Sequence, residues 1–148
     1  MMIPIAFPEP TFTVRAAPGP AMIRDMIRKK FVMLTPEEWV RQNFIHYLIK
    51  VKHYPTGLLS VEKELRLGTM RKRYDLLVYK NDTPWMMIEC KEQATKINAS
   101  VLDQILRYNM SLPVQYLVLT NGAETYCIER DGKSGRLLQA IPDYQDIA

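Results

Sequence analysis

Two carboxylates and a lysine stand at the ends of two neighbouring apolar segments. Asp75 precedes Leu76–Tyr79, and Glu89 and Lys91 close the segment that starts with Trp85–Ile88. Because residues i and i+2 of a strand point to the same face, Glu89 and Lys91 should project together. If the two segments pair as strands, Asp75 lies beside Glu89. The sequence therefore predicts two carboxylates and one ammonium group in a small space.

Such a group suggests metal-assisted hydrolysis. Two close carboxylates repel each other, and the pKa of one rises unless a cation neutralises them. Mg²⁺ (or Mn²⁺) suits a site with few carboxylates, because it keeps several waters and binds phosphate oxygens. A neighbouring lysine could position a water for attack on a phosphodiester. The alternative is an ordinary salt bridge of Glu89 with Lys91 or an arginine of 71–73. That alternative is the more common for an isolated E-x-K, but Asp75 shifts the balance toward function.

A helix should precede these strands. Thr35 can be its N-cap, Pro36 takes the first helical position, and Glu38 completes a capping box. Apolar residues then recur on one helical face, and Pro55 forbids continuation.

The other segments predict a mixed sheet. Strands are expected over 58–67, 71–79, 85–91, 115–120 and 124–129, with a turn before 136–141. A second amphipathic helix, capped by Asn98 or Ser100, should lie between the third and fourth strands and end by Pro113. The order predicts a single α/β or α+β domain with a mixed central β-sheet flanked by helices.

Three regions are expected along the chain. Residues 1–34 form a proline-rich N-terminal arm, which should dock through its apolar residues, and a basic segment that is either a hairpin or a solvated turn. Residues 35–142 form the folded domain. Residues 143–148 form a C-terminal tail, with mobility expected from Pro142 onward.

Composition limits the possible functions only loosely. The chain has 148 residues, enough for one domain with a core, and its net charge of +4 is compatible with a polyanionic partner. The two cysteines, Cys90 and Cys127, lie in apolar segments and are expected to be reduced core residues of a cytoplasmic protein. No membrane span or secretory signal is evident.

The spacing of the polar residues resembles a known nuclease pattern. Asp75, then Glu89-Cys90-Lys91, then Gln104 and Tyr108 as a Q-x-x-x-Y element, resemble the PD-(D/E)XK nuclease superfamily. The branch is the one shared by RecB-type nucleases and the N-terminal domain of type I restriction enzyme R subunits. Segments 35–42, 73–75 and 119–122 also look like the R-subunit domain, so that the resemblance covers roughly residues 35–130. Tyr74 stands where the motif name has proline.

The resemblance implies a restriction-endonuclease-like fold and roles for individual residues. Asp75 and Glu89 would be metal ligands, with the carbonyl of Cys90 as a possible third ligand. Lys91 would position the attacking water or stabilise charge at the phosphate.

Helical residues would complete the site. Gln104 and Tyr108 share a helix face and would support the site or contact the nucleic-acid backbone. The superfamily often adds a glutamate from the first helix, for which Glu38 is the candidate, with Glu37 and Glu64 behind it. The capping box is an equally good explanation of Glu38.

We therefore expect a Mg²⁺-dependent nuclease domain that hydrolyses DNA. The alternatives are a non-catalytic nucleic-acid-binding or complex subunit that keeps the fold, and a structural subunit with salt bridges at its strand ends. R subunits carry a helicase motor after this domain and this chain ends without one. A stand-alone module is therefore expected, either a small nuclease or a component that depends on a helicase or another restriction-system subunit.

Overall fold

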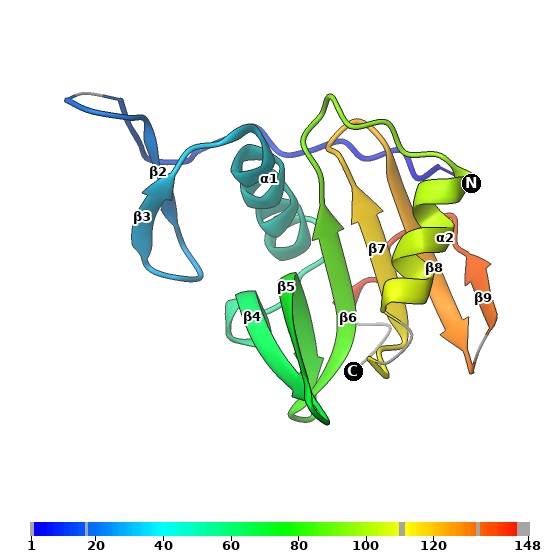
Figure 1. Ribbon diagram of the computed structural model, residues 1–148. Coiled ribbons are helices and arrows are strands. Elements are labelled where there is room, and N and C mark those ends of the chain that lie inside the picture. The colour runs from blue at the N-terminus through cyan, green and yellow to red at the C-terminus, as the bar shows by residue number, and fades with distance from the viewer. Residues whose placement is uncertain (1, 17, 110–111, 133, 145–148) are drawn as a thin grey trace.

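A six-stranded mixed sheet and a three-stranded antiparallel sheet, with two helices, make up the described part of the protein (Figure 1). The computed structural model describes residues 2–16, 18–109, 112–132 and 134–144. The large sheet contains β4 (Leu59–Leu67), β5 (Met70–Lys80), β6 (Thr83–Cys90), β7 (Tyr116–Thr120), β8 (Thr125–Asp131) and β9 (Ser134–Leu137) in that order. The small sheet contains β1 (Val14–Arg15), β2 (Met22–Asp25) and β3 (Lys30–Met33). The predicted α+β class is confirmed.

The helix α1 (Pro36–Lys50) begins where the sequence predicts. The Thr35 hydroxyl accepts a hydrogen bond from the Glu38 backbone N–H (3.0 Å), and Pro36 takes the first helical position. The helix ends at Lys50, one turn before the predicted stop, and a short 3₁₀ helix η1 (Thr56–Leu58) follows Pro55. Apolar residues of α1, including Phe44 and Leu48, pack on one face of the large sheet.

The two helices cover opposite faces of the large sheet (Figure 1). Strands β6 and β7 are parallel, and the helix α2 (Ala99–Tyr108) connects them, whereas every other neighbouring pair is antiparallel. Asn98 caps α2 by accepting from Val101 N–H (3.0 Å), and Leu106 packs under the helix against the second apolar cluster. The crossover brings the carboxyl end of β6 next to that of β7.

The hairpin β5–β6 is the centre of the sheet. Its turn uses Asn81 and Asp82, which both have positive φ (50° and 64°). Leu77 and Met87 form one pair of the ladder, and both are fully buried. The ladder shifts register between Val78 and Tyr79, so that Lys80 pairs with Thr83 near the turn and Leu76 pairs with Ile88 at the far end.

The N-terminal region is folded. The predicted hairpin is present as β2 and β3, and β1 adds a short third strand. The preceding arm docks as expected: Ile3 N–H donates to Thr125 O (2.8 Å), and the Phe7 ring contacts Phe44. The arm is therefore tied both to α1 and to the large sheet.

The start of the expected mobile tail is ordered. Pro142 O accepts from the Tyr54 hydroxyl (2.7 Å), and Tyr144 N–H donates to Lys52 O (3.0 Å). The expectation of mobility from Pro142 is thus wrong for 142–144, because these residues close over the end of α1. Residues 145–148 lie outside the described residues. The predicted domain boundaries stay a prediction. Throughout the described ranges, neither helix has the length and apolar character needed to cross a membrane.

Candidate active site

Asp75 lies where β5 and β6 separate. The last pair of their ladder is Leu76 with Ile88. Beyond this pair, the Cys90 backbone N–H donates to Asp75 Oδ2 (2.9 Å) instead of to a backbone carbonyl of β5. The Asp75 carboxylate thus occupies the fork between the strands, and the fork fixes its position.

The backbone of β4 is distorted opposite Asp75. Val61 pairs with Leu76 and Lys63 with Tyr74, but the ladder skips Glu62 and Asp75. Glu62 has a φ of +51°, a conformation that L side chains rarely adopt. Both skipped residues direct a carboxylate to the same arginine, Arg41, on α1. Local strain on β4 therefore accompanies an electrostatic contact that crosses from the sheet to the helix.

Glu89 and Lys91 lie beside each other at the carboxyl end of β6. Lys91 Nζ lies 3.7 Å from Glu89 Oε1, and both side chains are partly exposed. Burial, followed by the negative charge of Asp75, raises the pKa of Glu89 from 4.5 to about 7, although Lys91 acts in the opposite direction. The structure thus brings Asp75, Glu89 and Lys91 to one end of the central sheet. The carboxyl groups are close enough for one to resist ionisation.

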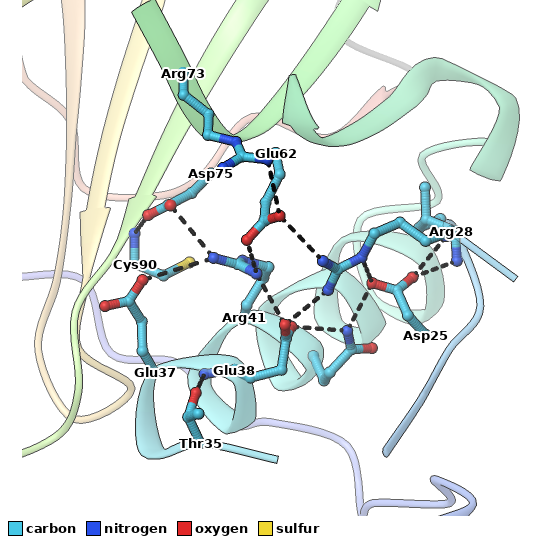
Figure 2. Close-up of polar contacts among 12 residues, drawn as sticks. Asp25, Arg28, Thr35, Glu37, Glu38, Arg41, Glu62, Arg73, Asp75 and Cys90 are labelled. Carbon is cyan, nitrogen blue, oxygen red and sulfur yellow. Dashed lines mark hydrogen bonds and ion pairs between the residues drawn. The ribbon is translucent and has the colours of Figure 1, made fainter. Parts of the chain in front are cut away.

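Arg41 is the cation that faces this end of the sheet from α1. Its guanidinium lies 3.3 Å from Asp75 Oδ1, 2.9 Å from Glu38 Oε1 and 3.5 Å from Glu62 Oε1 (Figure 2). The side chain is only 5% exposed. Burial opposes its charge, but Glu38 and Asp75 outweigh that cost and raise the pKa of Arg41. Arg41 was missed at the sequence level, although a charged residue on the same helical face as Phe44, Ile45 and Leu48 was a usable signal.

The two glutamates at the start of α1 face different surroundings. Glu38 is buried, and its carboxylate accepts from Arg28 (2.7 Å), Arg41 (2.9 Å) and Gln42 (3.1 Å). Glu37 is half exposed and lies toward Asp75: burial, then Asp75, raises the pKa of Glu37, while Arg41 at 3.6 Å lowers it. Figure 2 shows Glu37 on the Asp75 side of Arg41 and Glu38 on the Arg28 side. Glu37 is thus the nearer helical carboxylate, and the role predicted for Glu38 stays a prediction.

A chain of ion pairs continues from Glu38 into the small sheet (Figure 2). Arg28 contacts Asp25 (2.6 Å), Glu38 (2.7 Å) and Glu62 (3.5 Å), and Gln42 donates to Asp25 (2.9 Å). Asp25 is completely buried, and its hydrogen bonds with Arg28 and Gln42 lower its pKa against the opposing effect of burial. These contacts join β2, α1 and β4 around the candidate site.

Gln104 and Tyr108 lie on the exposed side of α2. The Tyr108 ring covers Lys72 Nζ at 4.2 Å, and the same ammonium donates to the Tyr108 carbonyl. Burial raises the pKa of Tyr74, and the charges of Tyr108 and then Glu89 raise it further. Tyr74 therefore lies near both residues. Among the described residues no hydrogen bond or ion pair joins Gln104 or Tyr108 to the carboxylates. Their predicted contribution to the site stays a prediction. The other candidate, Glu64, lies 3.8 Å from Arg71 on the exposed part of β4.

The donor set is small and consists of hard oxygens. In the described ranges, no group of three His, Cys, Asp or Glu side chains is arranged to hold a metal ion. Mg²⁺ needs fewer protein ligands than that, since it usually binds through one or two carboxylates and keeps several waters. Each Asp75 oxygen has one identified hydrogen-bond or ion-pair partner, and a carboxylate oxygen has a second lone pair that can bind a cation. Asp75, Glu89 and the main chain at Cys90 therefore fit such an ion, and the charge of Asp75 adds to the effect of burial in raising the pKa of Glu89. Burial raises the pKa of the Cys90 thiol well above its usual value, so that only its backbone is suited to a hard cation.

Comparison with known families gives one match. The model of the type I restriction enzyme R protein N terminus matches residues 36–142, which is most of the chain. No curated protein matches the chain.

Proposed function

Because the chain belongs to the family of the type I restriction enzyme R protein N terminus, we propose that it is a metal-dependent nuclease module that cuts DNA. The observation that carries the proposal is that Asp75, Glu89 and Lys91 meet at one end of the sheet, where burial and then the charge of Asp75 raise the pKa of Glu89 to about 7. Membership of the family fits partners of two kinds, DNA and other subunits of a restriction system, a helicase subunit among them.

In the proposal, Asp75, Glu89 and the Cys90 carbonyl hold one Mg²⁺ or Mn²⁺. When bound, such an ion supplies a Lewis acid for a phosphate oxygen and lowers the pKa of water. Arg41 and the Cys90 N–H keep the Asp75 carboxylate oriented in the fork between β5 and β6. Preformed orientation matters because little energy is then spent on reorganisation during the reaction.

Lys91 is the proposed catalytic cation. Its ammonium lies 3.7 Å from Glu89 and is partly exposed, so that it can reach both a water and a phosphate oxygen. In hydrolysis the water oxygen forms a bond to phosphorus, the bond to the leaving oxygen breaks, and that oxygen takes up a proton. Lys91 holds the water and offsets the negative charge that gathers on the phosphate.

A non-catalytic binding module is the second candidate. The observation in its favour is the ion pair of Arg41 with Asp75 (3.3 Å), which already supplies part of the positive charge that a metal would supply. Calorimetric titration with Mn²⁺ separates the two readings. Binding that is lost in Glu89→Gln supports the nuclease, and absence of binding in the wild type favours the binding module.

The function is tested by cleavage of labelled single-stranded and duplex DNA at low salt with Mg²⁺ or Mn²⁺. We expect weak cleavage that falls as salt rises, because phosphate contacts dominate non-specific affinity and the net charge is only +4. Lys91→Ala should abolish the cleavage without unfolding the protein. The matched control is Lys96→Ala, since Lys96 is an exposed lysine of the loop that follows β6. Cleavage that survives Lys91→Ala would contradict the proposal.

A further inference from the structure

The small sheet has two different faces. The inner face of β2 carries Ile23 and Asp25, which are both completely buried. Their partners in the ladder are Val14 and Val32 for Ile23, and Lys30 for Asp25. The neighbouring positions form the other face, because successive strand residues alternate. The outer face consists of Arg15, Met22, Arg24, Phe31 and Met33.

Two arginines of the outer face stack on one aromatic ring. The Arg15 guanidinium carbon lies 4.4 Å from the centre of the Phe31 ring, and that of Arg24 lies at 5.9 Å. Such contacts orient a guanidinium without neutralising it, because the ring has no net charge. The planar guanidinium groups therefore keep N–H donors for another partner.

The positive charge of this face is not compensated. Within the described part of the chain, neither Arg15 nor Arg24 forms an ion pair, and both are exposed. Lys29 adds an exposed cation at the turn between β2 and β3. The one acidic residue of the three strands, Asp25, is on the inner face and bound to Arg28.

Four arginines elsewhere in the protein differ in this respect. Arg28, Arg41, Arg73 and Arg136 each lie within 4 Å of a carboxylate, with Glu129 as the partner of Arg136. A phosphate would have to displace those carboxylates in order to bind these arginines. Binding to Arg15 and Arg24 displaces no carboxylate that the described residues place on them.

This face continues into the candidate active site. A cleft of about 500 Å³ lies between the small sheet and the large one. Met33 of the outer face lines this cleft, and so does Arg41, which contacts Asp75; the acidic residues of its lining are Glu37, Glu38, Glu62 and Glu92. The small sheet is also fixed in place, because Asp25 and Arg28 bind α1 through Gln42 and Glu38. Figure 1 shows it on the side of α1 away from the large sheet.

We propose that the outer face of the small sheet binds the phosphate backbone of a nucleic-acid strand beside the candidate active site. The proposal deepens the nuclease function and rests on it for the identity of the polyanion. Arg15 and Arg24 are the phosphate contacts, Phe31 holds their guanidinium planes, and Lys29 extends the charge toward the turn.

The test measures binding rather than cleavage. Fluorescence anisotropy with labelled oligothymidine and with a duplex of equal length, in EDTA, compares the wild type with Arg15→Gln/Arg24→Gln. The matched control is Lys50→Gln/Lys80→Gln, which removes the same charge at the far ends of α1 and β5. Circular dichroism melts check that each variant is folded.

The outer-face variant should bind single strands at least about tenfold more weakly, as expected for the loss of two charged hydrogen bonds. The slope of log K against log salt should flatten by roughly 1.4, at about 0.7 per phosphate contact on a single strand. The charge-matched control should change both quantities much less. Phe31→Leu keeps the charge, so that it should weaken binding with little change in slope.

Equal affinities of the two double variants would overturn the proposal, and so would a wild type that binds neither nucleic acid. A variant that loses binding to phosphatidylserine vesicles while binding DNA normally would assign the face to a membrane instead, and would also overturn it. The nuclease function fails separately, in a protein that binds DNA through this face and shows no Lys91-dependent cleavage with Mn²⁺.

Discussion

Replacing Glu89 by glutamine is expected to stabilise the metal-free protein at neutral and higher pH. In the native state the pKa of Glu89 is raised to about 7 by burial and by Asp75, whereas the unfolded chain has the ordinary value of 4.5. Between these values the native state holds more protons than the unfolded state. The free energy of unfolding of the wild type therefore falls as pH rises from 4.5, and the loss is complete above pH 7.

The size of the effect follows from the two pKa values. At 1.36 kcal/mol per pH unit, the ionised Glu89 costs the native state about 3 kcal/mol. Its side chain is 27% exposed, so that this figure is an upper value. Glutamine has similar volume and no charge, and it escapes the penalty. The free energy of unfolding of Glu89→Gln should match that of the wild type near pH 4 and exceed it by up to about 3 kcal/mol at pH 8.

Urea denaturation in EDTA at a series of pH values measures this difference. Glu64→Gln is the control, since Glu64 is an exposed glutamate on the neighbouring region of the sheet. A difference between Glu89→Gln and the wild type that does not grow with pH would refute the reasoning. Added Mn²⁺ should reverse the order at pH 8, because a ligand of the native state stabilises only the protein that binds it.

Two further predictions concern the supports of the site. Glu38→Gln should lower the free energy of unfolding by about 3 kcal/mol, because Arg28 and Arg41 then lose their buried carboxylate partner. Glu37→Gln should change it by less than about 0.5 kcal/mol, because Glu37 is half exposed. Thermal melts of the two variants measure the difference, and equal effects would contradict the assignment of Glu38 as the buried partner. Lys72→Met should lower the free energy of unfolding by about 1 kcal/mol and speed amide exchange in the last turn of α2, because the Lys72 ammonium donates a hydrogen bond to the Tyr108 carbonyl. Unchanged amide exchange there would show that Lys72 does not stabilise this end of the helix.

Local chemistry in the sequence determined where the helices begin and where the hairpin turns. Thr35 and Pro36 fix the start of α1, and Asn98 fixes that of α2. The turn at Asn81 and Asp82 connects β5 and β6. Each of these signals spans only a few residues, so that it can be read without knowing the rest of the fold.

The choice between Glu37 and Glu38 needed the tertiary structure. Neighbouring residues of a helix differ by about 100° in direction, so the sequence gives their relative positions but not which one faces the sheet. Packing of Val40, Phe44 and Leu48 against the large sheet sets the rotation of α1 about its axis. That rotation directs Glu38 to Arg28 and leaves Glu37 toward Asp75.

The cations around the site were decided by contacts between distant parts of the chain. Arg41 meets Asp75 across 34 residues, and Arg15 meets Phe31 across the small sheet. No local pattern distinguishes a guanidinium bound to a carboxylate from one that stays free for a phosphate. The difference depends on which carboxylates the folded chain brings within about 4 Å, because the strength of a charge pair is set by distance and burial.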